Sequence, residues 1–238
     1  MPALLTLVVV APPFDPHPTQ LRGAAGQLFE TPDSDHHAPM QPFAVGPLIS
    51  GIGSAQWRLG WLPDRAGPPG WPPPTVTFGS VTCQVLGRHR EESPFARLAS
   101  GKPVRRAGVR VLTPMFFSRN GRDLPLPDPV LIARNLANRW NTHAPAELAI
   151  DDALERDLLD GVFLAGMTGT TVQLPIGHRL HQTGFVGDLE LGLTRSAPAA
   201  AAQTFGALTQ FATIAGVGAL TTHGFGAVEV RPVQRRRG

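Results

Sequence analysis

The sequence predicts an α+β protein built from two tandem ferredoxin-like (RRM-like, split βαβ) domains, residues 1–102 and 103–238. The main observation is the order of the apolar patterns, which twice reads strand, helix, strand, strand, helix, strand. The second is length, because 238 residues suffice for one large domain or two small ones with real cores. The third is composition: 42% hydrophobic residues, with 26 glycines and 25 prolines, indicate a folded, loop-rich chain.

The first half contains one clear helix among several strands. The helix begins at Pro18, a residue suited to the first helical position, and the glycines Gly23 and Gly26 weaken it by about 1 kcal/mol each. A proline-rich connector, "GPPGWPPP", cannot join a sheet interior. The second helix of this half is short and lies in "ESPFARLA". Strands are predicted at residues 3–11, 42–50, 56–63 and 75–87.

The second half repeats the order with stronger helix signals. Asp128 and Pro129 form an N-cap and first turn before "VLIARNLANRW", and Pro198 opens a helix that runs to about residue 214. The inward stripe of this last helix is predicted to be Ala201, Phe205, Leu208 and Ala212. Strands are predicted at residues 108–117, 161–176, 184–194 and 224–230.

Composition narrows the class of protein further. A single cysteine, Cys83, excludes an internal disulfide and a cysteine-based zinc site, and it fits a reducing compartment. The apolar N-terminal run is too short to span a bilayer and has no basic residues before it. We therefore expect a cytoplasmic protein that does not use a membrane.

Positive charge is concentrated in one part of the chain. The formal net charge is only +3, yet the stretch from Arg88 to Arg122 holds nine basic residues and two acidic ones. Such a block favours an anionic partner, of which nucleic acid is the commonest. Charge alone is equally compatible with a solvated basic face.

Residues 215–230, "AGVGALTTHGFGAVEV", place four glycines before the last predicted strand: Gly216, Gly218, Gly224 and Gly226. One interpretation is a tight helix-to-strand turn with left-handed caps. A phosphate-binding P-loop and a dinucleotide fingerprint are excluded, because both need a helix after the glycines. A third interpretation is that the glycines let backbone amides approach a phosphodiester backbone. Spacing does not decide between the first and the third.

Several motifs together resemble one known family. Four segments are similar, in their order along the chain, to segments of the endoribonucleases that process CRISPR repeat RNA: "DHHAPMQPFAVGPL", "VLTPMFFSRNGRDLPLPDPVLIARNLANRWNTHAP", "TGFVGDLELGLT" and "LTQFATIAGVGALTTHGFGAVEV". These proteins belong to the repeat-associated (RAMP) superfamily of two ferredoxin-like domains. The chain departs from them at Ala219 and Leu220, where members often carry a basic residue before the paired threonines.

The resemblance implies a reaction and its catalytic residues. Members cleave precursor RNA within repeats without a metal or other cofactor, using the 2′-hydroxyl as nucleophile and leaving a 2′,3′-cyclic phosphate and a 5′-hydroxyl. Histidine suits the proton-transfer steps because its pKa lies near neutral pH. The family places its catalytic histidine in the loop after the first helix, which nominates His37 and, beside it, His36. The chain has no tyrosine that could carry the proton instead.

The expected partner is CRISPR repeat RNA or precursor guide RNA, and other subunits of a CRISPR effector complex are further candidates. A different class of function is a catalytically inactive subunit that holds the repeat end of the guide, and a third is an unrelated protein of this fold that binds a small anion. No histidine pair has chelating spacing with a carboxylate nearby, so no metal site is expected. The residues nominated for RNA binding are Arg22, Lys102, Arg105, Arg106, Gly216, Gly218, His223, Gly224 and Gly226.

Overall fold

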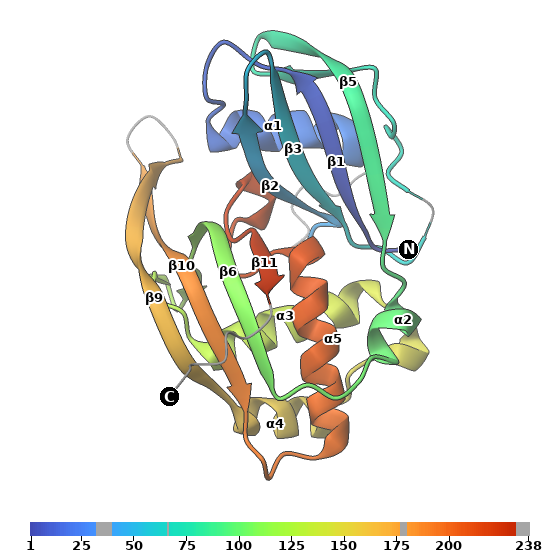
Figure 1. The fold of residues 1–238 in the computed structure, drawn as a ribbon, viewed down its shortest axis with the longest axis vertical. Coiled ribbons are helices and arrows are strands. Elements are labelled where there is room, and N and C mark those ends of the chain that lie inside the picture. Colours follow the sequence, from blue (N-terminus) through green and yellow to red (C-terminus); the bar gives the residue numbers. More distant parts are fainter. Residues whose placement is uncertain (32–39, 66, 177–179, 232–238) are drawn as a thin grey trace.

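The computed structural model describes residues 1–31, 40–65, 67–176 and 180–231. Two antiparallel sheets, each with helices on one face, stack end to end along the long axis of the molecule (Figure 1). Each sheet contains the four-strand order of a ferredoxin-like domain, so the predicted fold class is confirmed. No helix in the described ranges is long and apolar enough to cross a membrane.

The first domain is a five-stranded sheet covered on one face by α1 (Pro18–Phe29). In space the strands run β2 (Phe43–Ser50), β3 (Ser54–Trp61), β1 (Ala3–Val10), β5 (Val81–Glu92) and β4 (Thr75–Phe78). Helix α1 begins where the sequence predicts, because His17 caps it: its ring accepts a hydrogen bond from the Thr19 amide, and Gln20 accepts one from the His17 amide at 2.8 Å.

The short second helix predicted in "ESPFARLA" is present, but it does not lie between two strands of this domain. Helix α2 (Phe95–Ala99) follows the last long strand and packs on the other domain, where the Phe95 ring meets Trp140 edge-on at 4.7 Å. Between β3 and β4 the proline-rich connector takes the helix's place, and the Gly70 amide donates to the Leu28 carbonyl at 3.0 Å. Clustered prolines lack the amide donors that a helix requires. The boundary at residues 102 and 103 stays a prediction.

The second domain is a four-stranded sheet in the order β11 (Val228–Arg231), β6 (Arg106–Met115), β10 (His181–Leu193) and β9 (Val162–Pro175). Asp128 caps α3 as predicted, accepting from the Leu131 amide at 3.0 Å. Helix α4 and the small hairpin were not predicted. The remaining elements are α3 (Pro129–His143), α4 (Asp152–Gly161), α5 (Ala199–Ala215), the hairpin β7 (Phe117–Arg119) with β8 (Arg122–Leu124), and the short 3-10 turns η1 (Ala146–Leu148) and η2 (Thr221–His223).

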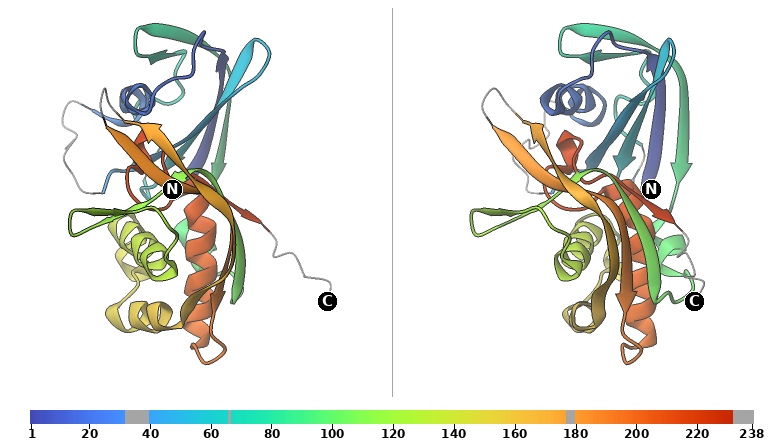
Figure 2. Two further views of the ribbon diagram at one scale, coloured as in Figure 1. Left: turned by 90° about the vertical axis from the view of Figure 1, so that its left-hand side faces the viewer. Right: turned by 60° about the vertical axis from the view of Figure 1, so that its left-hand side comes forward.

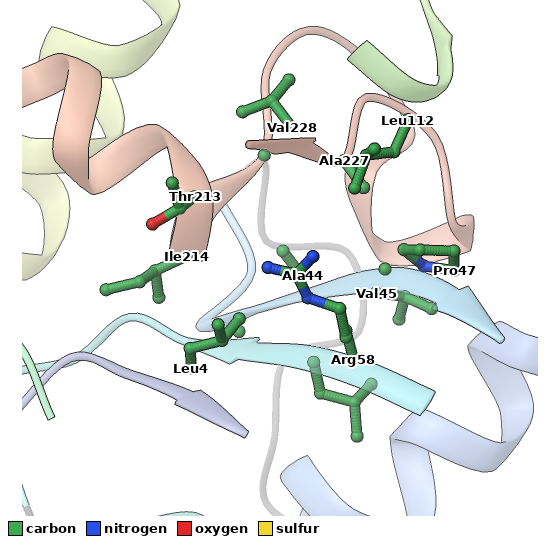
Figure 3. A pocket seen from close by; sticks show the side chains of 14 residues that line it. Leu4, Ala44, Val45, Pro47, Arg58, Leu112, Thr213, Ile214, Ala227 and Val228 are labelled. Carbon is green, nitrogen blue, oxygen red and sulfur yellow. The ribbon is translucent and has the colours of Figure 1, made fainter. Parts of the chain in front are cut away.

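The two domains meet where the carboxyl end of α5 lies on β3. A Cβ atom on Gly60 would lie 1.8 Å from the Ile214 carbonyl oxygen, so only glycine permits this approach. Beside it the Arg58 guanidinium donates to the Glu229 carboxylate of β11 at 2.5 Å. Figure 3 shows Arg58 and Ala44 facing the end of α5 across a small pocket lined by both domains. Close backbone packing at Gly60 and the Arg58–Glu229 ion pair therefore both help to join the domains.

We expect Gly60→Ala to destabilise the protein by about 1–3 kcal/mol, because the new methyl group must push the Ile214 carbonyl away. Gly23→Ala is the matched control, since nothing lies within 4 Å of a Cβ there and the helix gains about 0.5–1 kcal/mol. Urea unfolding of both variants measures the difference. Equal effects of the two substitutions would contradict this account of the domain junction.

Candidate nucleic-acid interface

The glycine-rich loop, residues 216–226, packs through η2 against α1 and β2 of the first domain. All four glycines are buried and have positive φ: 67° at Gly216, 90° at Gly218, 88° at Gly224 and 64° at Gly226. A Cβ would lie 2.3 Å from the Phe116 oxygen at Gly218, and 1.9 Å from the Val217 oxygen at Gly226. The glycines are therefore required by tight backbone packing.

Three of the four glycine amides are engaged within the chain. The Gly216 amide donates to the Ala212 oxygen at 2.9 Å, and the Gly218 amide donates to Asn135 Oδ1 at 3.0 Å. The Gly226 amide donates to the Pro114 oxygen at 2.9 Å. Gly224 instead faces the first domain, where its Cβ would lie 3.3 Å from Leu21 Cδ1. Contact of these glycines with RNA stays a prediction.

Helix α3 holds the loop through two side chains one turn apart, Asn135 and Arg139. Asn135 accepts from the Gly218 amide, and the buried Arg139 guanidinium donates to the Ala215 carbonyl and to Thr221 Oγ1. Burial lowers the pKa of Arg139 to about 10, so it stays charged at neutral pH. Neither residue was nominated from the sequence. The sequence did offer a signal for Arg139, which lies on the buried face of α3, one residue before Trp140. An arginine at such a position is almost never fully buried unless it has partners.

Arg22 lies at the meeting point of α1, β2 and the loop. Its guanidinium forms an ion pair with Glu30 and lies 5.0 Å from the centre of the Phe43 ring. The pair spans two turns of α1 across Gly26, where a Cβ would lie 2.9 Å from Glu30 Oε2 and 3.2 Å from Arg22 Nη1. The glycine that weakens the helix thus leaves room for the ion pair.

His223 completes this junction from the side of the loop. Its ring is half-buried, and Nδ1 lies 3.1 Å from Thr222 Oγ1. Burial lowers the pKa of His223, and the positive charge of Arg22 lowers it further. The imidazole is therefore neutral near pH 7, with one nitrogen able to donate and the other to accept a hydrogen bond. Arg22 and His223 are predicted RNA-binding residues that the fold brings together.

The other nominated arginines and lysine do not join this junction. Arg106 is the first residue of β6, and Met115 at the other end of this strand is near the glycine-rich loop. Ten strand residues span about 30 Å, so Arg106 lies about that far from the loop. Arg105 donates to the carbonyls of Thr194 at 2.5 Å and Ala197 at 2.8 Å, which is a structural role. Arg106 pairs with Glu190 at 2.9 Å, and Lys102 is exposed at the same end of the molecule. These residues and the loop do not form one site.

The remaining predictions concern catalysis and metal. His36 and His37 lie outside the described residues. They belong to the segment that connects α1, which carries Arg22, to β2, which carries Phe43. Within the described ranges, no group of three or more histidine, cysteine, aspartate or glutamate side chains is arranged to hold a metal ion.

Two ferredoxin-like domains joined at a glycine-rich loop define the class: a two-domain protein of the repeat-associated superfamily. The family described as "CRISPR-associated endoribonuclease Cas6" matches residues 109–228, half of the chain. The chain belongs to this Cas6 family, and it is an endoribonuclease that processes CRISPR RNA.

Individual relatives agree with this assignment. The Cas6 endoribonuclease of Mycobacterium tuberculosis is 25% identical over 228 residues, covering 89% of this chain and 71% of the relative. A solved Cas6 product complex is 25% identical, with a TM-score of 0.80 over 98% of this chain and 100% of the other. A second structure of that Cas6, in which a histidine is replaced by alanine, is 27% identical, with a TM-score of 0.75 over 98% and 100% of the chains.

We expect Arg22→Gln to raise the pKa of His223, because the substitution removes the positive charge that opposes protonation of the ring. Imidazole NMR titration, with the signal assigned from a His223→Gln variant, measures the shift. Arg22→Lys is the control, since it keeps the charge. An unchanged His223 pKa in Arg22→Gln would show that the two side chains are not electrostatically coupled.

Proposed function

We propose that this protein cleaves CRISPR precursor RNA within the repeats by a metal-independent attack of the 2′-hydroxyl, and that it retains the mature guide RNA. The carrying observation is the junction of α1, β2 and the glycine-rich loop. There a cation, Arg22, and a neutral imidazole, His223, meet beside the two ends of the segment that contains His36 and His37. Family membership and the solved product complex support RNA as the substrate.

The reaction needs two proton transfers and stabilisation of negative charge. A base takes the proton of the 2′-hydroxyl as its oxygen forms a bond to phosphorus. The bond from phosphorus to the 5′-oxygen breaks, and an acid protonates that leaving oxygen. The products are a 2′,3′-cyclic phosphate and a 5′-hydroxyl, so neither water nor a metal ion is consumed in the step. Histidine serves either proton role near neutral pH.

The residues divide these tasks as follows. His37 and His36 supply the proton-transfer group, and Arg22 stabilises the negative charge that builds up on the phosphate. His223, neutral and polarised towards Thr222, contacts the phosphate as a hydrogen-bond partner. Lys102, exposed at the far end of β6, contacts RNA away from the scissile bond.

The test uses end-labelled repeat RNA in EDTA, with and without a single 2′-deoxy substitution at each position in turn. Cleavage at one site, abolished by one 2′-deoxy substitution, is the expected result. We expect His37→Ala or His36→Ala, whichever removes the catalytic histidine, to slow single-turnover cleavage by about 10²- to 10⁴-fold. The double variant His36→Ala/His37→Ala should show the same loss. His89→Ala, an exposed histidine of β5, is the matched control and should cleave normally.

Each other outcome has a definite meaning. Tight RNA binding without cleavage by the wild-type protein would support the inactive RNA-holding subunit. Cleavage that requires a divalent ion, or that persists in the double histidine variant, would overturn the proposed mechanism. Absence of both binding and cleavage would overturn the proposed function.

A further inference from the structure

The hairpin β7–β8 belongs to neither of the two large sheets. Its two strands pair with each other alone, and the turn at Asn120 and Gly121 has φ values of 53° and 70°, as in the tight turns that close two-residue hairpins. In both views of Figure 2 it stands clear of the second domain. It points to the same side as the far end of the β9–β10 pair.

The base of the hairpin is fastened to the glycine-rich loop. The Phe116 carbonyl accepts from the Ala219 amide at 2.9 Å, and the Phe116 ring meets Phe225 edge-on at 5.7 Å. Phe117, the first residue of β7, is buried in the second domain's core. Because three strand residues extend about 10 Å, the tip lies about that far from the base that is fastened to the loop.

Two arginines occupy the tip of this hairpin. Arg119 and Arg122 are directly paired across the strands, so their side chains leave the same face, and both are exposed. Like charges in this position repel and destabilise a strand pair. Neither guanidinium has an ion-pair or hydrogen-bond partner among the described residues.

Four other arginines of the same basic stretch are engaged within the chain, whereas Arg88 and Arg110 are exposed like the hairpin pair. Arg90 pairs with Glu92, Arg97 donates to the Glu92 carbonyl and Ser93, and Arg105 and Arg106 bond to the second domain. The charge at the hairpin tip is therefore not needed for folding. A pair of parallel guanidinium groups matches successive phosphates, which accept two hydrogen bonds from each.

We infer that Arg119 and Arg122 bind the phosphodiester backbone of the RNA beside the cleavage site, and so hold the substrate without taking part in the chemistry. This inference rests on the proposed function. RNA is favoured over an acidic protein because the hairpin is anchored on the same loop that contacts α1 at the proposed cleavage site.

The test compares Arg119→Gln/Arg122→Gln with Arg156→Gln/Arg195→Gln in the full-length protein. The control removes the same charge from exposed arginines at α4 and before α5, away from the glycine-rich loop. We expect the hairpin variant to reduce the slope of log Kd against log salt by about 1.4–1.8, because two phosphate contacts are lost. Between 1 M and 0.1 M salt the wild-type Kd should therefore tighten about 25- to 60-fold more than that of the variant. Single-turnover cleavage at saturating protein should stay within about twofold of wild type, since the scissile site is intact.

Arg119→Lys/Arg122→Lys keeps the charge and should restore the salt slope. A hairpin variant that binds like the control, while the wild-type protein binds and cleaves, overturns this inference and leaves the proposed function intact. A loss of saturating cleavage rate with unchanged Kd also overturns it, because the arginines would then act on the chemistry. A wild-type protein that neither binds nor cleaves repeat RNA overturns the proposed function and this inference together.

Discussion

A buried arginine determines the shape of the site. Arg139 lies inside the second domain, and removing its charge from water costs free energy that its hydrogen bonds must offset. Those bonds go to the Ala215 carbonyl at the end of α5 and to Thr221 in the glycine-rich loop. One guanidinium therefore ties the helix end to the loop, and Asn135, one turn earlier on α3, holds Gly218 in the same loop.

The hydrogen bonds of Arg139 and Asn135 fix the position of the glycine-rich loop. The end of α5 and the loop then form the contacts between the two domains. The end of α5 rests on Gly60 of β3, while the loop rests on α1 and β2. Each domain thus brings one group to the junction, Arg22 from the first and His223 from the second. Neither domain alone contains the pair, so the relative placement of the two sheets is itself a requirement of the proposed chemistry.

Much of the fold could be predicted from periodicity. The core strands and long helices carry regular apolar patterns, and the helices have clear start signals such as the Asp128 cap and Pro198. The errors arose where tertiary contacts override local pattern. Helix α2 is short, and only its packing against Trp140 shows which domain it completes. Helix α4 was missed although Leu154 and Leu158 lie one turn apart and Asp151 caps its first turn. The proline-rich connector was recognised, but not its replacement of a helix.

The site was less predictable than the fold for a physical reason. A run of basic residues along the chain is spread over about 30 Å by an extended strand, so Arg105 and Arg106 lie far from the loop whose ligand they were expected to share. Conversely, Arg22 and His223 are two hundred residues apart in sequence and become neighbours only through the domain junction. Charge in the sequence favours an anionic partner, whereas contacts within the fold decide which charges remain available to it. By that criterion the arginines of the β7–β8 hairpin, which nothing in the described chain neutralises, carry more information about RNA than Arg90, Arg105 and Arg106, which pair within the fold.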